Sequence, residues 1–553
     1  PLGPENILIF AAGPLTGIAP CCARCVAVSR SPLTEGLGET TAGGTWGPAL
    51  KKSGFDAIIV RGKAEKPVYI WVNDGECEIR DASDLWGKDT YETTDYIVGE
   101  LKEKRASIAC IGPAGENLVR FASIVADKGR IWGRLGLGAV MGSKRLKAIA
   151  LSGEKQIPIA NLDKVKEKMV QVVRKVKDVA EKFRKYGTQA SVYSLLGIND
   201  TPLKYWTKGT WDKRDAFLGD TILSTYNLRR KACPICPIGC EGVIELPEFN
   251  IGPARAPEYE TLAAFGPLIL NSDIKAIAKA NDLCNRLGMD TISTGSVIAF
   301  IMECYEKKIV SEEKFGRIVK WGDMDRVIGL IEEIAYRSTK LGDLLANGSA
   351  RVAKVLGAEN IAVHVKGLDV AMHDPRAAFS SALMYATQPR GGSHTDLTYL
   401  IDYGRLAFPE VGIRNPPETV EETVDVVIKM QNISALADAL IFCKFGFLGG
   451  ITLSDLVEFI KYVTGWDVDF EWVLRTGERL FTIKRLFISK IGMKKEEDKL
   501  PKRIISPLPE GPAKGRIPPI SEMIDKYYQL RGCDKHGFPS YEKIRELGLE
   551  GYC

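Results

Sequence analysis

The chain has 553 residues, of which 45% are hydrophobic and 26% charged, and this composition excludes a disordered or fibrous protein. Its net charge of +5 is too small for its length to indicate a nucleic-acid-binding protein, and no apolar run reaches the roughly 18 residues of a membrane span. The 13 cysteines are odd in number, in a chain too large to need a disulfide framework. We therefore expect a cytoplasmic protein in which some thiols bind metal.

The first part of the chain has the pattern of a β-rich domain. Short apolar runs bounded by turn residues predict strands at 57–60, 68–72, 77–80, 108–111 and 148–151. Asn73-Asp74-Gly75 lies between the second and third of these runs and predicts a hairpin turn. We expect this β-rich domain to extend over residues 1–157.

After Asn161 the apolar residues recur at steps of three and four. This pattern predicts a long amphipathic helix from Leu162 to Phe183, and similar patterns predict helices at 274–287, 324–338 and 420–440. A Pro-rich connector over 504–519 precedes a predicted last helix near Tyr527. The predicted fold class is therefore α+β: the β-rich domain is followed by mainly helical domains over 158–363 and 364–553.

The strongest local motif is Cys233-Pro-Ile-Cys236-Pro-Ile-Gly-Cys240. Three thiolates at this spacing, on a loop bent by Pro and Gly, can bind one face of an iron–sulfur cube, and a distant cysteine then binds the fourth iron. Zinc is one alternative, although no second cysteine or histidine pair is near, and a purely structural cluster is another. Spacing leaves the fourth ligand open among Cys284, Cys304, Cys443, Cys533 and Cys553.

A second motif is the glycine-rich run from Gly133 to Lys144. It is not a P-loop, because a serine separates its last glycine from Lys144, and it lacks the third glycine of the dinucleotide fingerprint. Its backbone amides, beside Arg130, Arg134 and Lys144, can bind a phosphate. The alternative is that the glycines allow tight packing under a sheet, and the sequence favours neither.

Acid and imidazole groups occur in two further segments. Two of the four histidines lie in loop-like contexts, His373 before Asp-Pro-Arg and His394 after Gly-Gly-Ser. A loop histidine is more often a hydrogen-bonding residue than a catalyst, so context assigns no role to either. Pro257-Glu258-Tyr259-Glu260-Thr261 is by itself an ordinary acidic stretch.

These blocks together resemble the tungsten-containing aldehyde:ferredoxin oxidoreductase family nearly from end to end. The family has a further segment before the match to Pro1, so we expect this chain to be incomplete there. The matching text comprises Ala11-Ala-Gly-Pro-Leu-Thr-Gly, Ser31-Pro-Leu-Thr, Gly112-Pro-Ala-Gly-Glu-Asn117, Gly136-x-Gly-Ala-Val-Met-Gly-Ser-Lys144, the cysteine motif, Pro257-Glu-Tyr-Glu-Thr261, Leu287-Gly-Met-Asp290, Asp374-Pro-Arg376 and Tyr527-Tyr-x-x-Arg531-Gly.

The resemblance implies tungsten, or the chemically similar molybdenum, held by two pterin dithiolenes, with Mg²⁺ bridging their phosphates and a [4Fe–4S] cluster nearby. It implies a β-rich base under the pterins, covered by two helical domains, and makes the loop from Arg130 to Lys144 part of the pterin cradle. Thr41, in the place of an Asn, and Ile131 match positions whose backbone carbonyls approach Mg²⁺. Arg24 matches an arginine between pterin and cluster.

Two pterin-binding motifs of the family read D-x-x-G-L-[CD]. The first matches Asn285-Arg-Leu-Gly-Met289-Asp290, in which Asn stands in the place of Asp. An amide both donates and accepts hydrogen bonds, so the resemblance implies adjusted pterin contacts at Asn285.

The second motif matches Asp438-Ala-Leu-Ile-Phe442-Cys443 and lacks its glycine. This match makes Cys443 the fourth cluster ligand, a choice that spacing alone leaves open. The implied cluster ligands are Cys233, Cys236, Cys240 and Cys443.

The resemblance also places Glu260 and His394 beside the metal. Glu260 is then the base that activates water or the aldehyde hydrate, and His394 donates a hydrogen bond to the carbonyl oxygen. Glu258 is the alternative base, because counts from the two flanking motifs differ slightly there. Electrons then leave singly through the cluster by way of Arg24 and Cys443.

Two departures from the family have no explanation in the resemblance. Cys21, Cys22 and Cys25 flank Arg24 and are either small packing residues near the pterin or groups that tune the metal site. No histidine has Glu three residues before it, so the E-x-x-H motif of the metal-bridged homodimer in some family members is absent. The chain is therefore expected in a homodimer or in a hetero-oligomer with iron–sulfur subunits.

The resemblance implies reversible oxidation of aldehydes to carboxylic acids, with electrons passed to ferredoxin or to iron–sulfur subunits. An alternative with the same fold is the catalytic subunit of a tungsten benzoyl-CoA reductase-type complex, which needs a wide channel for a CoA thioester. A remote alternative is an electron-transfer subunit that keeps the cluster and lacks the mononuclear metal. The sequence identifies neither the substrate nor the walls of its pocket.

Overall fold

The computed structural model describes residues 1–552. Strands β1 to β10 all lie in the first 152 residues, which confirms the predicted β-rich N-terminal region. The strands are β1 (Leu8–Ala11), β2 (Cys25–Arg30), β3 (Leu37–Ala42), β4 (Ala57–Val60), β5 (Val68–Asn73), β6 (Glu76–Asp81), β7 (Ser107–Cys110), β8 (Ile124–Ala126), β9 (Arg130–Trp132), β10 (Leu146–Ser152), β11 (Arg229–Lys231), β12 (Glu241–Leu246), β13 (Ile251–Arg255), β14 (His364–Val365) and β15 (Leu368–Asp369).

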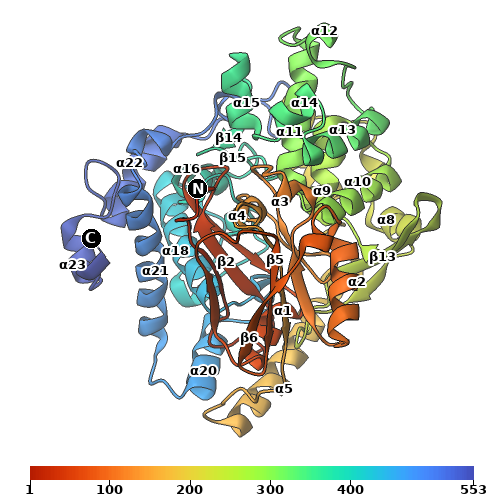
Figure 1. Ribbon diagram of the computed structural model, residues 1–553. Helices are drawn as coiled ribbons and strands as arrows, with labels where there is room; N and C mark the ends of the chain where they lie inside the picture. Colours follow the sequence, from red (N-terminus) through yellow and green to blue (C-terminus); the bar gives the residue numbers. More distant parts are fainter. Residues whose placement is uncertain (553) are drawn as a thin grey trace.

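Helices dominate the rest of the chain, also as predicted. In Figure 1 the N-terminal sheets occupy the centre of the view, with helices of the middle of the chain to their right and C-terminal helices to their left. The helices are α1 (Trp46–Lys52), α2 (Thr90–Leu101), α3 (Pro113–Glu116), α4 (Leu137–Ser143), α5 (Leu162–Val179), α6 (Glu181–Tyr186), α7 (Ser191–Leu196), α8 (Gly219–Tyr226), α9 (Tyr259–Phe265), α10 (Ile274–Leu287), α11 (Thr291–Glu306), α12 (Glu312–Phe315), α13 (Met324–Tyr336), α14 (Lys340–Leu345), α15 (Ser349–Leu356), α16 (Phe379–Thr387), α17 (Thr398–Asp402), α18 (Val420–Ala439), α19 (Phe445–Leu448), α20 (Leu453–Thr464), α21 (Phe470–Lys490), α22 (Ile520–Arg531) and α23 (Tyr541–Glu546).

The N-terminal region contains two sheets. One has the strand order β3-β2-β1-β4 and is antiparallel, and the other has the order β6-β5-β10-β7-β8-β9. The predicted hairpin is β5–β6, whose turn residues Asp74 and Gly75 both have positive φ (46° and 94°). That geometry is the type I′ turn, which matches the twist of the two strands and is favoured by Asp-Gly.

An aromatic cluster packs in the core between the two sheets. The rings of Phe10, Trp46 and Trp132 lie 5.3–5.6 Å apart, centroid to centroid. Both buried indoles donate a hydrogen bond, Trp46 to the carbonyl of Ile149 and Trp132 to the carbonyl of Cys25. The sheets are thereby joined by apolar burial in which the indole N–H groups of Trp46 and Trp132 are both paired.

Helix α10 shows how local residues set its bounds. Asp273 accepts hydrogen bonds from the amides of Lys275 and Ala276 at its start, and Gly288 ends it in the left-handed conformation (φ 74°). An Asp N-cap and a glycine after the last turn are the expected signals. The predicted range of 274–287 is therefore confirmed.

Two predictions about helices were wrong, one on where a helix ends and one on which helix is the last. The helix predicted from Leu162 to Phe183 is interrupted at Ala180, and α6 begins at Glu181. No Gly or Pro marks this break, so the apolar period continues across it. The predicted last helix, α22, is followed by α23, which is too short for periodicity to reveal.

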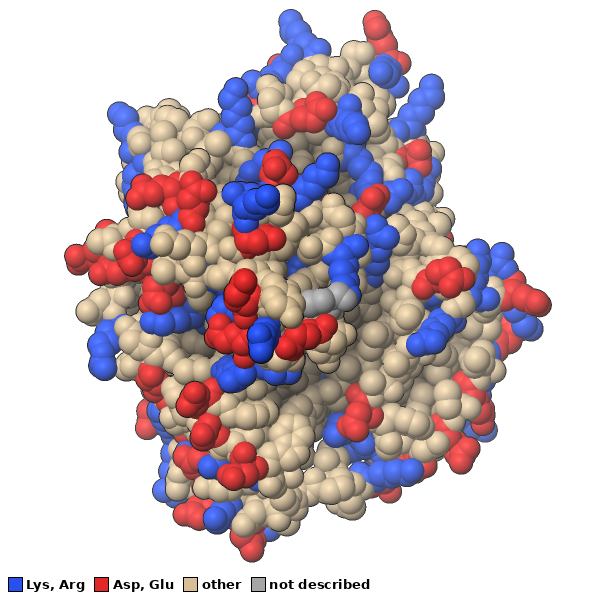
Figure 2. Space-filling model, turned by 90° about the vertical axis from the view of Figure 1, so that its left-hand side faces the viewer, with Lys and Arg blue, Asp and Glu red and all other residues tan. Residues whose placement is uncertain are grey.

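The predicted domains pack against one another. Helix α5, in the predicted domain 158–363, packs on α20 in the predicted domain 364–553. No helix of residues 1–552 is both long and apolar enough to cross a bilayer. On the face shown in Figure 2, basic and acidic side chains are interspersed, and that face carries no dense basic stripe.

Candidate active site and cluster site

Two neighbouring cavities contain most of the residues singled out from the sequence. The first, of about 270 Å³, is lined by four basic and two acidic side chains and is called the basic cavity: Arg24, Arg134, Arg390 and Lys444, with Glu39 and Asp438. The second, of about 320 Å³, contains the motif cysteines and is called the cysteine cavity. Both cavities share Arg24, His394, Leu397, Cys443 and Phe445.

The cysteine cavity is lined by five cysteines: Cys233, Cys236 and Cys240 from one segment, Cys443 from a distant segment, and Cys21 from the N-terminal region. The first three lie in the loop between β11 and β12, in which Ile235 and Gly239 adopt positive φ. Cys443 follows α18. Four sulfur donors suit an iron–sulfur cluster, and because the set includes no imidazole it does not match a mixed zinc site.

The other candidates for the fourth thiol lie elsewhere. Cys284 on α10 and Cys304 on α11 are fully buried in the helical core. Cys533 lies near Arg485, Arg531 and Asp498 rather than beside the motif cysteines. Cys553 lies outside the described residues. Of the candidates in residues 1–552, Cys443 is the one that lines the cysteine cavity.

Arg24 bridges the two cavities. Its guanidinium donates to the Thr41 carbonyl oxygen (3.0 Å) and lies 3.8 Å from the Cys443 sulfur. Thr41 and Ile131, on β3 and β9, line the basic cavity together with Phe442. The excess of basic groups here fits a ligand that carries phosphates.

Of the remaining residues predicted to contact pterin, some line a cavity and others do not. Lys444 lies 3.0 Å from Asp438 and, with Lys484 and Arg390, lowers the pKa of this carboxyl although burial alone would raise it. Asp290 pairs with Arg134 (Nε to Oδ2, 3.1 Å), and Met289 is buried beside it. Arg130, which pairs with Glu241, lines the cysteine cavity, whereas Met289, Asp290 and Asn285 line neither cavity.

Asn285 nevertheless has one unusual atom. Its backbone carbonyl accepts from Thr90 (2.8 Å), whereas its buried side-chain Oδ1 has no hydrogen-bond partner within residues 1–552. A buried acceptor without a partner costs free energy, about 1–3 kcal/mol. The side chain therefore remains able to accept a hydrogen bond from a further group.

The glycine-rich run mainly serves packing. A Cβ on Gly136 would lie 1.9 Å from the Arg120 carbonyl oxygen, and one on Gly142 would lie 2.0 Å from that of Gly115. Lys144 donates to the carbonyls of Pro4 and Gly62 and so ties down the N-terminal segment. Only the beginning of the run, from Gly133 to Leu135, lines the basic cavity.

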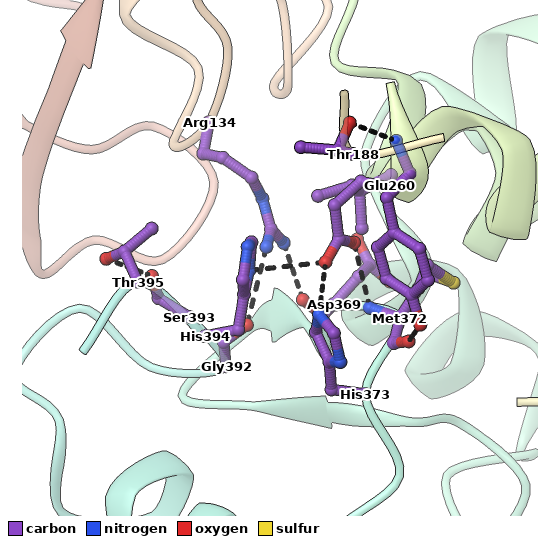
Figure 3. A network of polar contacts seen from close by, with 12 residues as sticks. Arg134, Thr188, Glu260, Asp369, Met372, His373, Gly392, Ser393, His394 and Thr395 are labelled. Carbon is purple, nitrogen blue, oxygen red and sulfur yellow. Dashed lines mark hydrogen bonds and ion pairs between the residues drawn. The ribbon is translucent and has the colours of Figure 1, made fainter. Parts of the chain in front are cut away.

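Glu260 lies between two histidines (Figure 3). Its Oε1 is 3.4 Å from His373 Nε2 and 3.4 Å from His394 Nδ1, and its Oε2 accepts from the Met372 amide (2.9 Å). Oε1 and His394 Nδ1 are buried without a well-aligned hydrogen bond in residues 1–552. Glu260 lies on α9, and both its carboxylate and the His394 ring line the cysteine cavity. These two atoms are therefore available to a bound molecule.

His373 adjoins Glu260 in this group, and the sequence assigned no role to it. Its Nδ1 lies 2.5 Å from Asp200 Oδ2, and Tyr403 donates to the other Asp200 oxygen (2.6 Å). The ring is stacked between Tyr259 and Tyr399, at centroid distances of 4.7 and 4.0 Å. The available signal was its position before Asp-Pro-Arg, but its partner Asp200 is 173 residues away.

Burial and charge set the protonation of this group of residues. Burial raises the pKa of Glu260 above its ordinary value, against the effect of His373. Burial lowers the pKa of His394 well below its ordinary value, so this imidazole is neutral. For His373, burial alone would lower the pKa, but the Asp200 carboxylate raises it. Glu260, whose pKa is raised, thus lies between one imidazole whose pKa is lowered, that of His394, and one whose pKa is raised, that of His373.

Glu258 has a different environment. It is held by Arg255 (3.1 Å) and accepts a hydrogen bond from Thr188. It lines the cysteine cavity near Cys240, whose thiol pKa is raised first by burial and then by Glu258. Neither histidine forms an ion pair with it within residues 1–552.

Family models match almost the whole chain. The model for the N-terminal domain of aldehyde ferredoxin oxidoreductase covers residues 1–153, and the model for its domains 2 and 3 covers residues 164–549. The chain belongs to the aldehyde ferredoxin oxidoreductase family. The resemblance inferred from the sequence blocks is therefore confirmed.

Individual relatives agree with this membership. The tungsten-containing aldehyde ferredoxin oxidoreductase of Pyrococcus furiosus is 41% identical over 99% of this chain and 91% of its own length. The aliphatic sulfonate oxidoreductase, WOR-like subunit, of the same organism is 30% identical over 99% and 89%. Among solved structures, the active-site complex BamBC of benzoyl coenzyme A reductase matches with a TM-score of 0.85 and 26% identity, covering 100% of this chain and 90% of its own.

Proposed function

We propose that this protein oxidises aldehydes to carboxylic acids and passes the electrons through a [4Fe–4S] cluster to ferredoxin. The observation that carries the proposal is the placement of Glu260 and His394, with buried atoms that lack partners, on the cavity that also contains the four cysteines. The 41% identity to a tungsten-containing aldehyde ferredoxin oxidoreductase supports this substrate class over an aromatic CoA thioester.

The cofactors would be held by this chain's own residues. Cys233, Cys236, Cys240 and Cys443 would bind the cluster. The pterin side would use the basic cavity, where Arg24, Arg134, Arg390 and Lys444 offer positive charge to phosphates. The carbonyls of Thr41 and Ile131 would approach Mg²⁺, and Asp438 and Phe442 would contact pterin.

The overall reaction converts an aldehyde and water into a carboxylic acid, two electrons and two protons. The bound tungsten–pterin group would supply oxygen transfer and accept both electrons. Glu260 would take a proton from water or the aldehyde hydrate at Oε1, for which a pKa raised by burial makes it a stronger base. Once Glu260 carries this proton, its Oε1–H can donate to His394 Nδ1, so the neutral imidazole keeps its own proton on Nε2 and would donate it as a hydrogen bond to the substrate oxygen.

The proton then has a path away from the substrate. His373 Nε2 adjoins Glu260, and the Asp200 carboxylate stabilises the charged imidazole on the opposite side of the ring. Tyr403 donates to Asp200 and holds the carboxylate in place. The stacked Tyr259 and Tyr399 keep water from the ring faces.

The electron-transfer partners would be ferredoxin or iron–sulfur subunits. The protein itself would be cytoplasmic and would assemble as a homodimer or a hetero-oligomer. The benzoyl-CoA reductase-type reading has one supporting observation, the TM-score of 0.85. If the protein were an electron-transfer subunit without a mononuclear metal, the unpartnered atoms of Glu260 and His394 would have no role.

Elemental analysis of protein purified without oxygen tests the proposal. Tungsten or molybdenum near one per chain, with about four irons, is expected. An aldehyde screen with oxidised viologen as electron acceptor should then give turnover, and benzoyl-CoA with reduced viologen as electron donor should give none. Iron without tungsten or molybdenum would favour the electron-transfer reading, and zinc alone would contradict every iron–sulfur reading.

A further inference from the structure

The loop that contains Cys233, Cys236 and Cys240 separates the cysteine cavity from solvent. Cys233 and Cys236 line the cavity, whereas Ile235, which lies between them in the sequence, does not. Ile235 is instead 38% exposed, and its φ of 55° is unusual for a β-branched residue. An apolar side chain thus points to solvent from the same loop whose cysteines face inward.

Basic side chains gather beside this exposed isoleucine. Segments 181–185 and 229–231 flank the loop and together contain six basic residues and one acidic residue, whereas the whole chain has 75 basic and 70 acidic residues. Five of the six are called the basic rim and are exposed, apart from the half-buried Arg184: Lys182, Arg184, Lys185, Arg229 and Lys231. The positive charge here is therefore far more concentrated than in the chain as a whole.

Hydrogen bonds hold both segments of the basic rim against the loop. Arg184 on α6 donates to the Pro237 carbonyl (3.0 Å). Arg230 on β11 points inward and donates to the carbonyls of Cys240 (2.9 Å) and Lys185 (3.1 Å). The backbone that carries the rim is therefore fixed relative to the three motif cysteines.

Most of the charge of the basic rim remains available to a partner. Two of its five cations have an acidic partner, in the exposed pairs Arg229–Glu245 and Lys185–Asp220. The other three form no ion pair within residues 1–552: Lys182, Arg184 and Lys231. Because water and salt screen exposed pairs, even the two paired cations can exchange their partner for another anion.

We propose that the basic rim, centred on Ile235, is the docking surface for a ferredoxin whose own surface is acidic. The inference rests on the proposed function, because it requires that the motif cysteines bind the cluster from which electrons leave. A docked ferredoxin would accept one electron at a time, and two such transfers balance the two electrons released by each aldehyde molecule.

Position and charge together favour this partner. A protein that takes electrons from the cluster must approach it, and at Ile235 the wall of the cavity is the cluster-binding loop itself. Complementary charge steers an acidic protein to this place, and an apolar centre within a polar rim is the common arrangement of an interface. A nucleic acid, the other large anion, would need a longer basic stripe.

The test is the binding of a purified acidic ferredoxin to the anaerobically purified holoenzyme, measured by calorimetry at several ionic strengths. For the double variant Lys182→Glu and Lys231→Glu, the Kd should rise by about tenfold or more at low salt, because two steering charges are reversed. Its KM for ferredoxin in aldehyde oxidation should rise in the same proportion. Turnover with viologen, which needs no docking surface, should stay at the parental rate.

Two further variants separate charge from position and from apolar contact. The double variant Lys340→Glu and Lys354→Glu reverses two exposed charges on α14 and α15, which lie at the top of Figure 1, whereas α5, just before α6, lies at the bottom. It should keep the parental Kd. Ile235→Asn removes the apolar centre and accepts the left-handed φ, so it should raise the Kd without changing the salt dependence, at parental iron content.

The results that would overturn the inference can be told apart. A parental Kd in the variant of Lys182 and Lys231 would place the docking surface elsewhere. An equal rise in the variant of Lys340 and Lys354 would show that only net charge matters. A parent protein that oxidises aldehydes with viologen but does not bind the ferredoxin would overturn this inference alone. A parent protein without iron and without viologen activity would overturn the proposed function together with it.

Discussion

The Nδ1 atom of His373 lies 2.5 Å from Oδ2 of Asp200, while Nε2 of the same ring faces Glu260 at 3.4 Å. The imidazole thus connects two carboxylates that come from distant parts of the chain. The ring is fully buried between two tyrosines, so neither contact is screened by water. The charge of His373 therefore depends on Asp200, and the basicity of Glu260 depends on His373.

Replacing Asp200 with Asn should change the pH dependence of turnover. Without the carboxylate, burial lowers the pKa of His373, and the neutral ring no longer lowers the pKa of Glu260. The acid limb of kcat/KM should move to higher pH, and kcat should fall roughly tenfold to a hundredfold. Tyr403→Phe, which removes a donor but no charge, should leave the limb in place. A pH profile identical to that of the parent would contradict this coupling.

Replacing Glu260 with Gln should reduce kcat by about 10²–10⁴-fold, because the amide cannot accept the proton. Tungsten and iron contents should stay at parental levels, since neither group is expected to bind through this residue. Glu258→Gln is the matched control and should retain most of the activity. The assignment of the base would pass to Glu258 if that variant lost as much turnover with its metals intact.

His394→Asn should lower kcat by about 10²-fold while both metals remain bound, as expected for loss of one hydrogen-bond donor to a developing charge. Steady-state kinetics and elemental analysis of the same preparation measure the two properties together. Turnover at the parental rate would remove His394 from the mechanism.

Cys236→Ala and Cys443→Ala should each abolish the spectroscopic signal of the cluster. A cube that loses one thiolate has an iron without a protein ligand. Cys284→Ala is the control, because this thiol is fully buried on α10, away from the cavity. It should keep about four irons at some cost in stability. Full iron content in Cys443→Ala would reopen the choice of the fourth ligand.

Asp498→Asn should destabilise the protein by about 3–5 kcal/mol, because it leaves buried Lys366 and Arg485 without their anion. Burial alone would raise the pKa of Asp498, but these two cations lower it to about 2, below the ordinary 3.8. Its stabilising contribution is therefore complete above about pH 4 and is lost as pH falls towards 2. The midpoint of thermal unfolding, measured against pH, checks both effects.

The control for this stability measurement is Asp81→Asn. Asp81 forms an exposed ion pair with Lys66, and exposed pairs contribute little because water and salt screen them. Its unfolding midpoint should match that of the parent. If Asp498→Asn also matched the parent, the buried cations would have another anion.

Local residues were enough to predict several features of this protein. The β5–β6 hairpin follows from Asp74-Gly75, which accept positive φ, and α10 follows from its period together with Asp273 and Gly288. The three-cysteine loop is also local, because its cysteines lie within eight residues. In each case the determining contacts are close in sequence, so a short window of residues contains them.

The site itself could not be predicted from such windows. Cys443 meets the motif cysteines because the β11–β12 loop and the segment after α18 pack around the same cavity. His373 meets Asp200 because residues 173 positions apart in sequence come together in the buried core. The packing role of Gly136 depends likewise on a carbonyl in another segment. Burial then sets the pKa values of Glu260 and His394, and burial is a property of the assembled core rather than of any residue's neighbours in sequence.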